Sequence, residues 1–526
     1  MSCSDPGNSD VIAAASAIAA AQSRSQGVAG LSYADLRDDF HRLKGTYRQS
    51  LGNLPASDED IADALDAIAH EVDSDERIQL EDRTRILDRI EHTRGHIGTD
   101  ELDIDQATLQ TWRRVGTHEH LAMLRERQAA RAQAQEHLTP QVDREFGSHT
   151  PEDAASKWAA ATDEQRAHWM KVGYRSLGRT DGLPAAVRDR ANRRTLAQDL
   201  EHAAEQLRAL DRGQTVRGTP LTAERAARYR AEWEKKARIL RTIDEEIDVA
   251  ASRGIKAQLL RYSANDTGRA VVAMGDVDKA QHVAVLVPGM STTVPRTLAS
   301  HMRSAEAVAA RARAFAVTDD GSQETVSAVA WIGYRAPQGV VGAAVPWRAN
   351  KGGQDLRSNL RGIRAASDAA ETDQHITLIG HSYGSLTAGK ALRGRTGVDD
   401  VAFVGSPGVG AKRATDLQVN PDNVYVAQAR GDIVALLGRY GDPMTEQFGA
   451  KVLSTAGDRT SHDNVELSEI RGHSDYYDAG SESLDNLAAV VAGRPHLART
   501  QDHRTFAQWA GSVFSQAVGT LTGAHR

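Results

Sequence analysis

The hydrophobic pattern changes its period near Gly254, and this change constrains the fold more than any other feature of the sequence. Beyond Gly254 short apolar runs recur, and several are continuous rather than alternating, as expected of strands covered on both faces. Amphipathic helical stretches, such as Leu298–Ala314 and Ser385–Arg393, separate the later runs. This alternation predicts an α/β fold in which a mostly parallel sheet has helices on both sides. The runs span residues 259–263, 270–274, 282–287, 325–331, 376–380, 401–405 and 424–429.

Residues 32–250 follow a helical period instead. Ser57–Asp60 and Thr150–Asp153 both read as helix starts, with a capping hydroxyl followed by acids that suit the positive end of a helix. The second start also has a proline at the first helical position. A last long helix is expected from about Thr222 to Val249.

The length of 526 residues exceeds what one core usually supports, which is roughly 250–300 residues. We predict a helical, partly flexible N-terminal region at 1–150 and an α/β catalytic domain at 251–526. Residues 151–250 are expected to form a helical segment that packs on that domain, since no linker-like composition separates the two.

Composition limits the partners and the location of the chain. A formal charge of -7 excludes a general polyanion binder, so we expect no nucleic-acid partner. Cys3 is the only cysteine, which leaves no intramolecular disulfide. The apolar stretch Val11–Ala21 is too short to span a bilayer, and acids rather than Lys or Arg precede it. We expect a cytoplasmic protein without a transmembrane segment, while signal-independent export, such as type VII secretion, stays open.

One strand–turn–helix segment carries the strongest indication of chemistry. Residues 376–385 read ITLIGHSYGS, a G-x-S-x-G pattern with a β run before it and an amphipathic helix after it. Such a turn holds the hydroxyl of Ser382 clear of the sheet, while Gly380 and Gly384 leave room for close strand–helix packing. We predict that Ser382 is a nucleophile. The alternative is a glycine-rich turn without chemistry.

The nucleophile needs a base, and the base needs an orienting carboxylate. In this type of fold the acid follows a later strand. Asp432 comes directly after the run at 424–429 and is therefore the predicted acid, although a turn or cap residue would read similarly. Asp422 precedes that run and Asp442 lies deeper in the following loop, so both are weaker candidates.

The predicted base is His473, because it lies in a loop just before the terminal helix that is expected to begin near Ser481. His462, which lies in a very polar stretch, stays an alternative. His503 lies beyond the terminal helix.

The oxyanion that forms on attack requires two N–H donors. The residue after the nucleophile, Tyr383, supplies the first. The turn after the run at 282–287 is expected to supply the second, from Met290 or, failing that, Ser291.

Aromatic residues of the segment AWIGYRAP at 330–337 provide a candidate acyl pocket. The segment ends a strand at the same edge of the sheet as Ser382, so Trp331, Tyr334 and Pro337 are candidates to line this pocket. Trp331 is equally well explained as a large core residue.

Several motifs together resemble a family of actinobacterial α/β-hydrolases long catalogued as a domain of unknown function. The resemblance implies a Ser–Asp–His site, which falls on Ser382, Asp432 and His473. The GSPG segment is also similar to the GxP turn of class 3 lipases, which favours lipid or acyl esters as substrates. The motifs are DGLPAAVRDRANRRTL at 181–196, HVAVLVPGMSTTV at 282–294, AWIGYRAP at 330–337, GHSYGS at 380–385, GSPG at 405–408 and GHSDYY at 472–477.

These observations predict a serine carboxylester hydrolase of the esterase or lipase type that acts through an acyl-enzyme on a small-molecule or lipid ester. Peptidase, thioesterase and acyltransferase activities share the same chemistry. The alternative is a helical interaction or type VII-secreted effector scaffold whose helical region recruits a protein partner and whose catalysis is secondary or lost. No cluster at metal-ligand spacing and no phosphate-binding Gly-Lys-Ser/Thr loop is present in the sequence, so no metal or cofactor is expected.

Overall fold

The computed structural model describes residues 142, 145–146, 150–212, 222–318, 320–339, 347–432, 442–459 and 465–503. All of them belong to one compact unit, Ile97–Arg526. The helices predicted before residue 142, including the start at Ser57–Asp60, lie outside the described residues.

Eight strands form one sheet in the order β1-β2-β4-β3-β5-β6-β7-β8. The pairs β1–β2 and β2–β4 are antiparallel, and the remaining pairs are parallel. The mostly parallel sheet predicted from the sequence is therefore confirmed. The strands are β1 (Ala257–Ser263), β2 (Arg269–Met274), β3 (His282–Val287), β4 (Val326–Ile332), β5 (His375–His381), β6 (Asp400–Val404), β7 (Val424–Ala427) and β8 (Lys451–Leu453).

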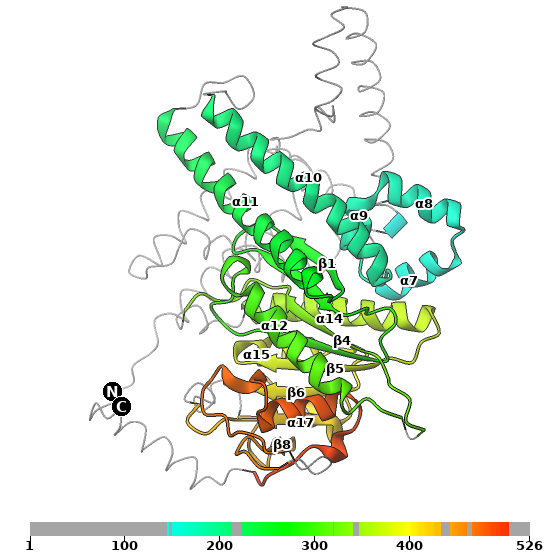
Figure 1. Ribbon diagram of the computed structural model, residues 1–526, viewed down its shortest axis with the longest axis vertical. Coiled ribbons are helices and arrows are strands. Elements are labelled where there is room, and N and C mark those ends of the chain that lie inside the picture. Colours follow the sequence, from blue (N-terminus) through cyan, green and yellow to red (C-terminus); the bar gives the residue numbers. More distant parts are fainter. Residues whose placement is uncertain are drawn as a thin grey trace, which may run out of the picture. The chain divides into compact units, whose positions relative to one another are not determined.

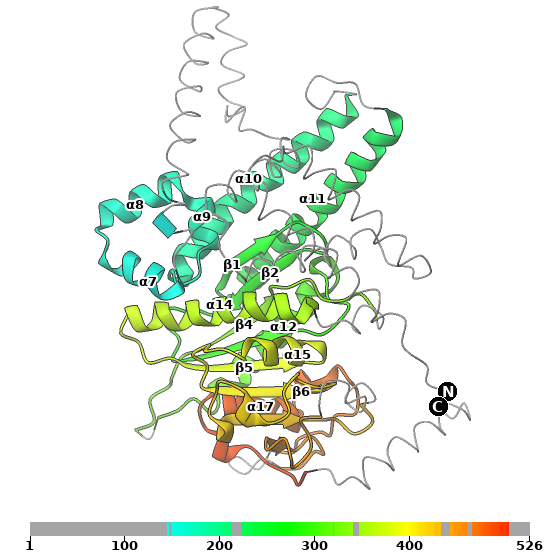
Figure 2. The same cartoon turned by 180° about the vertical axis from the view of Figure 1, so that it is seen from behind.

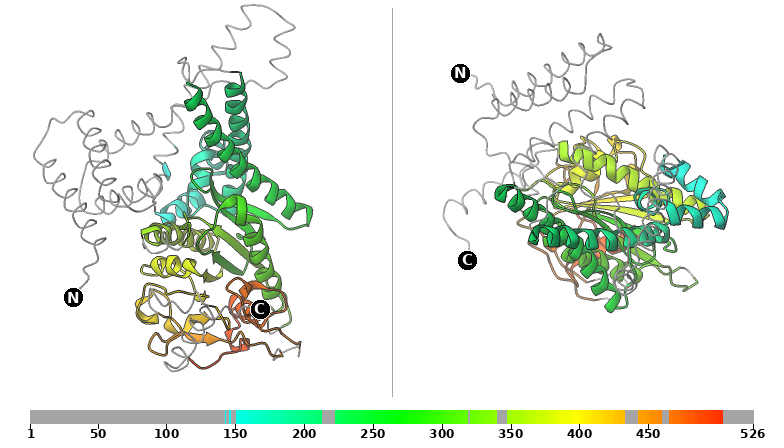
Figure 3. Two further views of the ribbon diagram at one scale, coloured as in Figure 1. Left: turned by 90° about the vertical axis from the view of Figure 1, so that its left-hand side faces the viewer. Right: turned by 90° about the horizontal axis from the view of Figure 1, so that it is seen from above.

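Helices cover both faces of the sheet, as Figures 1 and 2 show from opposite sides and Figure 3 from the edge. One face carries α12 and α17, and the other carries α14 and α15. The helices of the described residues are α7 (Pro151–Ala160), α8 (Asp163–Val172), α9 (Tyr174–Arg179), α10 (Ala185–Asp211), α11 (Ala223–Ser252), α12 (Val294–Arg313), α14 (Trp347–Ala369), α15 (Tyr383–Ala391) and α17 (Glu482–Val491), with short 3-10 turns η1 (Ala414–Asp416), η2 (Pro421–Asn423), η3 (Asp475–Tyr477) and η4 (Pro495–Leu497).

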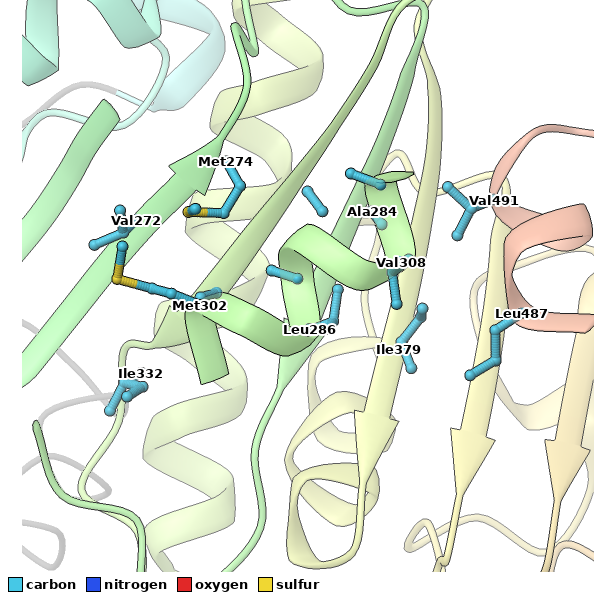
Figure 4. Close-up of a cluster of buried hydrophobic side chains, with 14 of the residues drawn as sticks. Val272, Met274, Ala284, Leu286, Met302, Val308, Ile332, Ile379, Leu487 and Val491 are labelled. Carbon is cyan, nitrogen blue, oxygen red and sulfur yellow. The ribbon is translucent and has the colours of Figure 1, made fainter. Parts of the chain in front are cut away.

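The continuous apolar runs are explained by this two-sided burial. Val283, Val285 and Val287 of β3 pack towards α14 and α15. Ala284 and Leu286, which alternate with them, pack towards α12 and α17, in the cluster drawn in Figure 4. A strand buried on both faces has no polar side to alternate with, which is why its sequence reads as one apolar run.

A third, smaller core lies among α7, α8, α9 and the start of α10. Thr150 caps α7 in a reciprocal capping box with Asp153, with Pro151 at the first turn, as the sequence predicts. Trp158 and Trp169 pack together in this core at 5.9 Å between ring centroids. Phe146, from before the predicted boundary at residue 150, packs edge-on against Trp169.

The long helices α10 and α11 join the face that carries α12. Thr222 caps α11 through a bond from Arg225 N–H, which confirms the predicted start. Leu196 of α10, together with Ile239 and Ile243 of α11, contributes to the core on that face. The helical stretch before residue 250 thus contacts the sheet directly.

Helix α10 also supplies hydrogen bonds to the outermost strand, β1. Asp189 accepts from Leu259 N–H at 2.7 Å, and Asn192 donates to Leu259 O at 2.9 Å. Arg193 donates to Ala257 O at 2.7 Å. These backbone groups would otherwise be the unpaired edge of the sheet. The DRANRR portion of the motif at 181–196 therefore has a structural explanation.

Candidate active site

The elbow after β5 holds Ser382 in a strained conformation. Its φ is 55° and its ψ is -129°, a region that non-glycine residues rarely occupy. The Ser382 N–H donates to Val404 O at 3.0 Å, so the strained residue is tied to the end of the adjacent strand β6. Tyr383 then begins α15, which places the serine at the positive end of that helix.

Three glycines make this turn possible. A Cβ on Gly380 would lie 2.9 Å from Ser385 Cα, and one on Gly384 would lie 2.3 Å from Val287 O. These close approaches agree with the packing predicted for the elbow. A Cβ on Gly289 would lie 3.0 Å from Ser382 Oγ, so the Pro-Gly turn after β3 keeps the side of the serine unobstructed.

Asp432 and His473 form a close pair at the same edge of the sheet. Asp432 follows β7 and its side chain is fully buried. His473 Nδ1 lies 2.8 Å from Asp432 Oδ1 and 2.9 Å from Oδ2. An imidazole whose Nδ1–H is held by a carboxylate has Nε2 available as an acceptor for a hydroxyl proton.

Two residues that the sequence reasoning missed complete the surroundings of this carboxylate. Tyr476 OH donates to Asp432 Oδ2 at 2.7 Å. Gly405, at the end of β6 with φ 57°, has no side chain where a Cβ would lie 2.9 Å from Asp432 Oδ2 and 3.2 Å from His473 Cε1. Both belong to motifs singled out above, GHSDYY and GSPG, but nothing in either motif indicated contact with Asp432.

His381, directly before the predicted nucleophile, links the turn that carries Ser382 to the loop that carries His473. Its Nε2 lies 2.7 Å from His473 O, and because a carbonyl can only accept, His381 donates. The two imidazole rings also pack at 4.8 Å between centroids. Burial lowers the pKa of His381 to about 4, with the positive charge of His473 adding to the effect. His381 is therefore neutral at pH 7 and serves as a hydrogen-bond donor.

The hydrogen bond between Ser382 Oγ and His473 is not formed within 3.5 Å in the described residues. Such bonds are often longer without substrate and shorten in the reacting complex. Ser382 itself is buried, with 3% of its surface exposed.

The loop after β3 favours Met290 over Ser291 as the second oxyanion donor. The N–H of Ser291 donates to Pro337 O at 2.8 Å and so is occupied. The N–H of Met290 has no acceptor within the part of the chain that the structure describes. Tyr334 OH, which donates to Pro288 O at 2.8 Å, anchors the same turn.

Trp331 and Tyr334 lie inside the core. Their rings stack at 5.9 Å between centroids, and Tyr334 stacks in turn on the Tyr383 ring at 6.4 Å. The exposed fraction of 1% for Trp331 favours the core-residue interpretation that the sequence left open for it, and Tyr334 is buried as well, with 2% exposed. A role in an acyl pocket stays a prediction.

The rival acid and base candidates are placed differently. Asp422 lies on η2, before β7 and thus at the opposite end of that strand from Asp432. Asp442 accepts from Met444 N–H in its own turn. His503 is bound to Ala450 O, and His462 lies outside the described residues.

Within the described ranges no group of three or more His, Cys, Asp or Glu side chains could hold a metal ion. The same part of the chain contains no helix long and apolar enough to cross a membrane.

The sheet order, the strained strand–serine–helix turn and the acid–histidine pair at the carboxyl edge define an α/β-hydrolase fold. A model of a family described as alpha/beta hydrolase matches residues 263–441. An uncharacterized Mycobacterium tuberculosis protein, Rv0963c, is 33% identical over 193 residues, which cover 36% of this chain and 71% of the relative. The chain belongs to this alpha/beta hydrolase family, and its mycobacterial relatives confirm the predicted actinobacterial resemblance.

Two further similarities are more distant. Rv2079, another uncharacterized protein of M. tuberculosis, is 28% identical over 368 residues, covering 64% of this chain and 54% of the relative. The chain thus spans about half the length of that relative. A solved esterase of Pyrobaculum calidifontis aligns with 48% of this chain and 91% of its own at 12% identity, with a TM-score of 0.28. A similarity of that size does not bear on activity.

Proposed function

We propose that the protein is a serine hydrolase that cleaves carboxylic acyl or lipid esters through an acyl-enzyme, with Ser382 as nucleophile, His473 as base and Asp432 as the orienting acid. The observation that carries the proposal is the buried Asp432 carboxylate bound to His473 Nδ1 at the sheet edge where Ser382 occupies its strained turn. A structural ion pair would not require a strained serine at the same edge.

The reaction follows from these groups. Ser382 Oγ attacks the ester carbonyl carbon while His473 Nε2 accepts its proton. The N–H groups of Tyr383 and Met290 are proposed to receive the resulting oxyanion. When the intermediate collapses, the alkoxide leaves with the proton from His473, and the acyl group stays on Ser382. Water then attacks the acyl-enzyme with His473 again as base, which releases the carboxylic acid and restores the serine.

The proposal is tested by covalent labelling. A fluorophosphonate probe should label the wild-type protein at Ser382, and a panel of p-nitrophenyl esters of different chain lengths should reveal turnover and the preferred acyl group. Ser382→Ala should abolish labelling and lower turnover by on the order of a million-fold, because a triad without its nucleophile retains only binding and oxyanion stabilisation.

Ser300→Ala is the matched control. Ser300 is an exposed serine on α12, far along the sequence from the elbow, and the variant should label as the wild type does. Labelling that persists in Ser382→Ala would refute the assignment of the nucleophile. An unlabelled, inactive wild type would instead favour the scaffold interpretation.

A further inference from the structure

We infer that Tyr476 is a positioning residue that fixes the Asp432 carboxylate for catalysis, an inference that rests on the proposed function. The phenol hydroxyl is bonded to Asp432 and to the backbone of Ala429. It acts through Asp432, and so through the orientation of His473.

The phenol hydroxyl links both ends of the turn that carries the acid. It accepts from Ala429 N–H at 2.8 Å and donates to Asp432 Oδ2 at 2.7 Å. The turn is closed in addition by the bond from Asp432 N–H to Ala429 O at 3.2 Å. With its OH engaged on both sides, Tyr476 fixes the distance between the end of β7 and the carboxylate.

Tyr476 and His473 reach the carboxylate from the same short segment. His473 lies just before η3 and Tyr476 lies within it, three residues later in the chain. The segment is fixed at its start by Gly472 N–H, which donates to Asp475 Oδ2 at 2.7 Å. Asp432 therefore receives the imidazole N–H and the phenol O–H from one rigid unit.

Burial increases the cost of losing a hydrogen-bond donor to the Asp432 carboxylate. The Asp432 side chain is fully buried and Tyr476 is 0% exposed, so no water can replace a lost donor without a rearrangement. The phenol binds Oδ2, while His473 Nδ1 lies close to both oxygens, 2.8 Å from Oδ1 and 2.9 Å from Oδ2. The phenol bond thereby disperses part of the negative charge that faces the imidazole. Removing the hydroxyl would allow the carboxylate to rotate and would concentrate its charge on the side facing the imidazole.

The test is Tyr476→Phe, which removes one oxygen and keeps the ring in its core position. We expect kcat/KM to fall by roughly ten- to a hundredfold, the usual effect of one hydrogen bond to a charged group. The rising limb of the pH–rate profile should move to higher pH, because a carboxylate with less dispersed charge stabilises the protonated imidazole more strongly. A purely structural tyrosine would not move the pH profile.

Tyr477→Phe provides the matched control. Tyr477 is the adjacent tyrosine, and its buried hydroxyl has no hydrogen-bond partner in the described residues. This variant should retain wild-type kinetics. Thermal unfolding curves of both variants identify an assay temperature at which each is fully folded.

A double variant tests whether Tyr476 acts through the acid. In an Asp432→Asn background, Tyr476→Phe should cost much less than it does in the wild type, because the group that it positions has already lost its charge.

The outcomes separate this inference from the proposed function. An active wild type together with a Tyr476→Phe variant of unchanged rate and pH profile overturns the positioning role alone. Loss of rate with an unchanged pH profile and full additivity with Asp432→Asn also overturns it. A wild type that is neither labelled nor active overturns the proposed function and this inference with it.

Discussion

Asp432 is the residue on which the proposed chemistry most depends after the serine. A neutral amide in its place keeps the shape of the side chain but cannot hold His473 in the same tautomer or stabilise the imidazolium. Asp432→Asn should therefore lower turnover by about a thousandfold or more while the protein stays folded. Turnover of p-nitrophenyl esters and circular dichroism measure the two effects, and a variant that keeps near-normal activity would show that Asp432 is only a turn residue.

Single substitutions can also test the choice of His473 over His462 as the base. His473→Ala should resemble Ser382→Ala in ester turnover, because the proposed base would be lost together with the imidazole that Asp432 holds. His462→Ala, which changes a histidine of the polar stretch, should behave almost as the wild type. If His462→Ala were the inactive variant, the base would have been assigned to the wrong loop.

Single residues differ in how far the sequence predicts them. Ser382 was predictable because its strained turn requires a local glycine pattern between a strand and a helix. The contact of Asp432 with His473 followed only from the order of elements along the chain. Tyr476 could not be recognised, because its partner Asp432 lies 44 residues earlier and no local pattern records a contact of that separation.

At the scale of elements, α10 forms hydrogen bonds with the outer edge of β1, the strand at one end of the sheet. Asn192 is buried and donates both to Leu259 O of the edge strand and to Gly178 O of α9. Asn192→Ala should lower the free energy of unfolding by about 1–3 kcal/mol, since two buried carbonyls lose their donor. Denaturation in urea measures this change.

Arg190→Ala is the control on the same helix. Arg190 is exposed, and its replacement should change the free energy of unfolding by less than about 0.5 kcal/mol. Equal stability of the two variants would mean that the bonds from α10 to the edge contribute little.

The elements themselves were largely predictable, because long apolar runs and capping signals are local. The seven predicted strands are present, with β7 ending at Ala427 rather than near residue 429. Strand β8 was missed because Lys451–Leu453 is too short to show any period. The bonds from α10 to β1 were also beyond prediction, because Asp189 and Asn192 contact Leu259, far later in the chain, and no local pattern records such a contact.

At the scale of the whole molecule, the predicted division of the chain into domains can be tested directly with fragments. A fragment that begins near Gly254 would lose α10 and α11, baring both the apolar face that Ile239 and Ile243 cover and the edge of β1. We expect it to aggregate. Size-exclusion chromatography of the purified fragment measures this.

The matched fragment should keep residues 140–526. A cut at the predicted boundary near residue 150 would remove Val142 and Phe146, which are buried in the third core, so the cut is placed before them. This fragment should stay monodisperse and retain ester hydrolysis. A monomeric, fully active 254–526 fragment would contradict the prediction and make the helical half an independent module.

The cover that α10 provides for β1 has a consequence for synthesis on the ribosome. Because Asp189, Asn192 and Arg193 precede Leu259 in the chain, the helix leaves the exit tunnel before the strand whose edge it satisfies. The helix is therefore already available when β1 emerges, at a stage when the parallel strands that complete the sheet have not yet been translated. We expect this order to limit pairing of the β1 edge with other chains during synthesis.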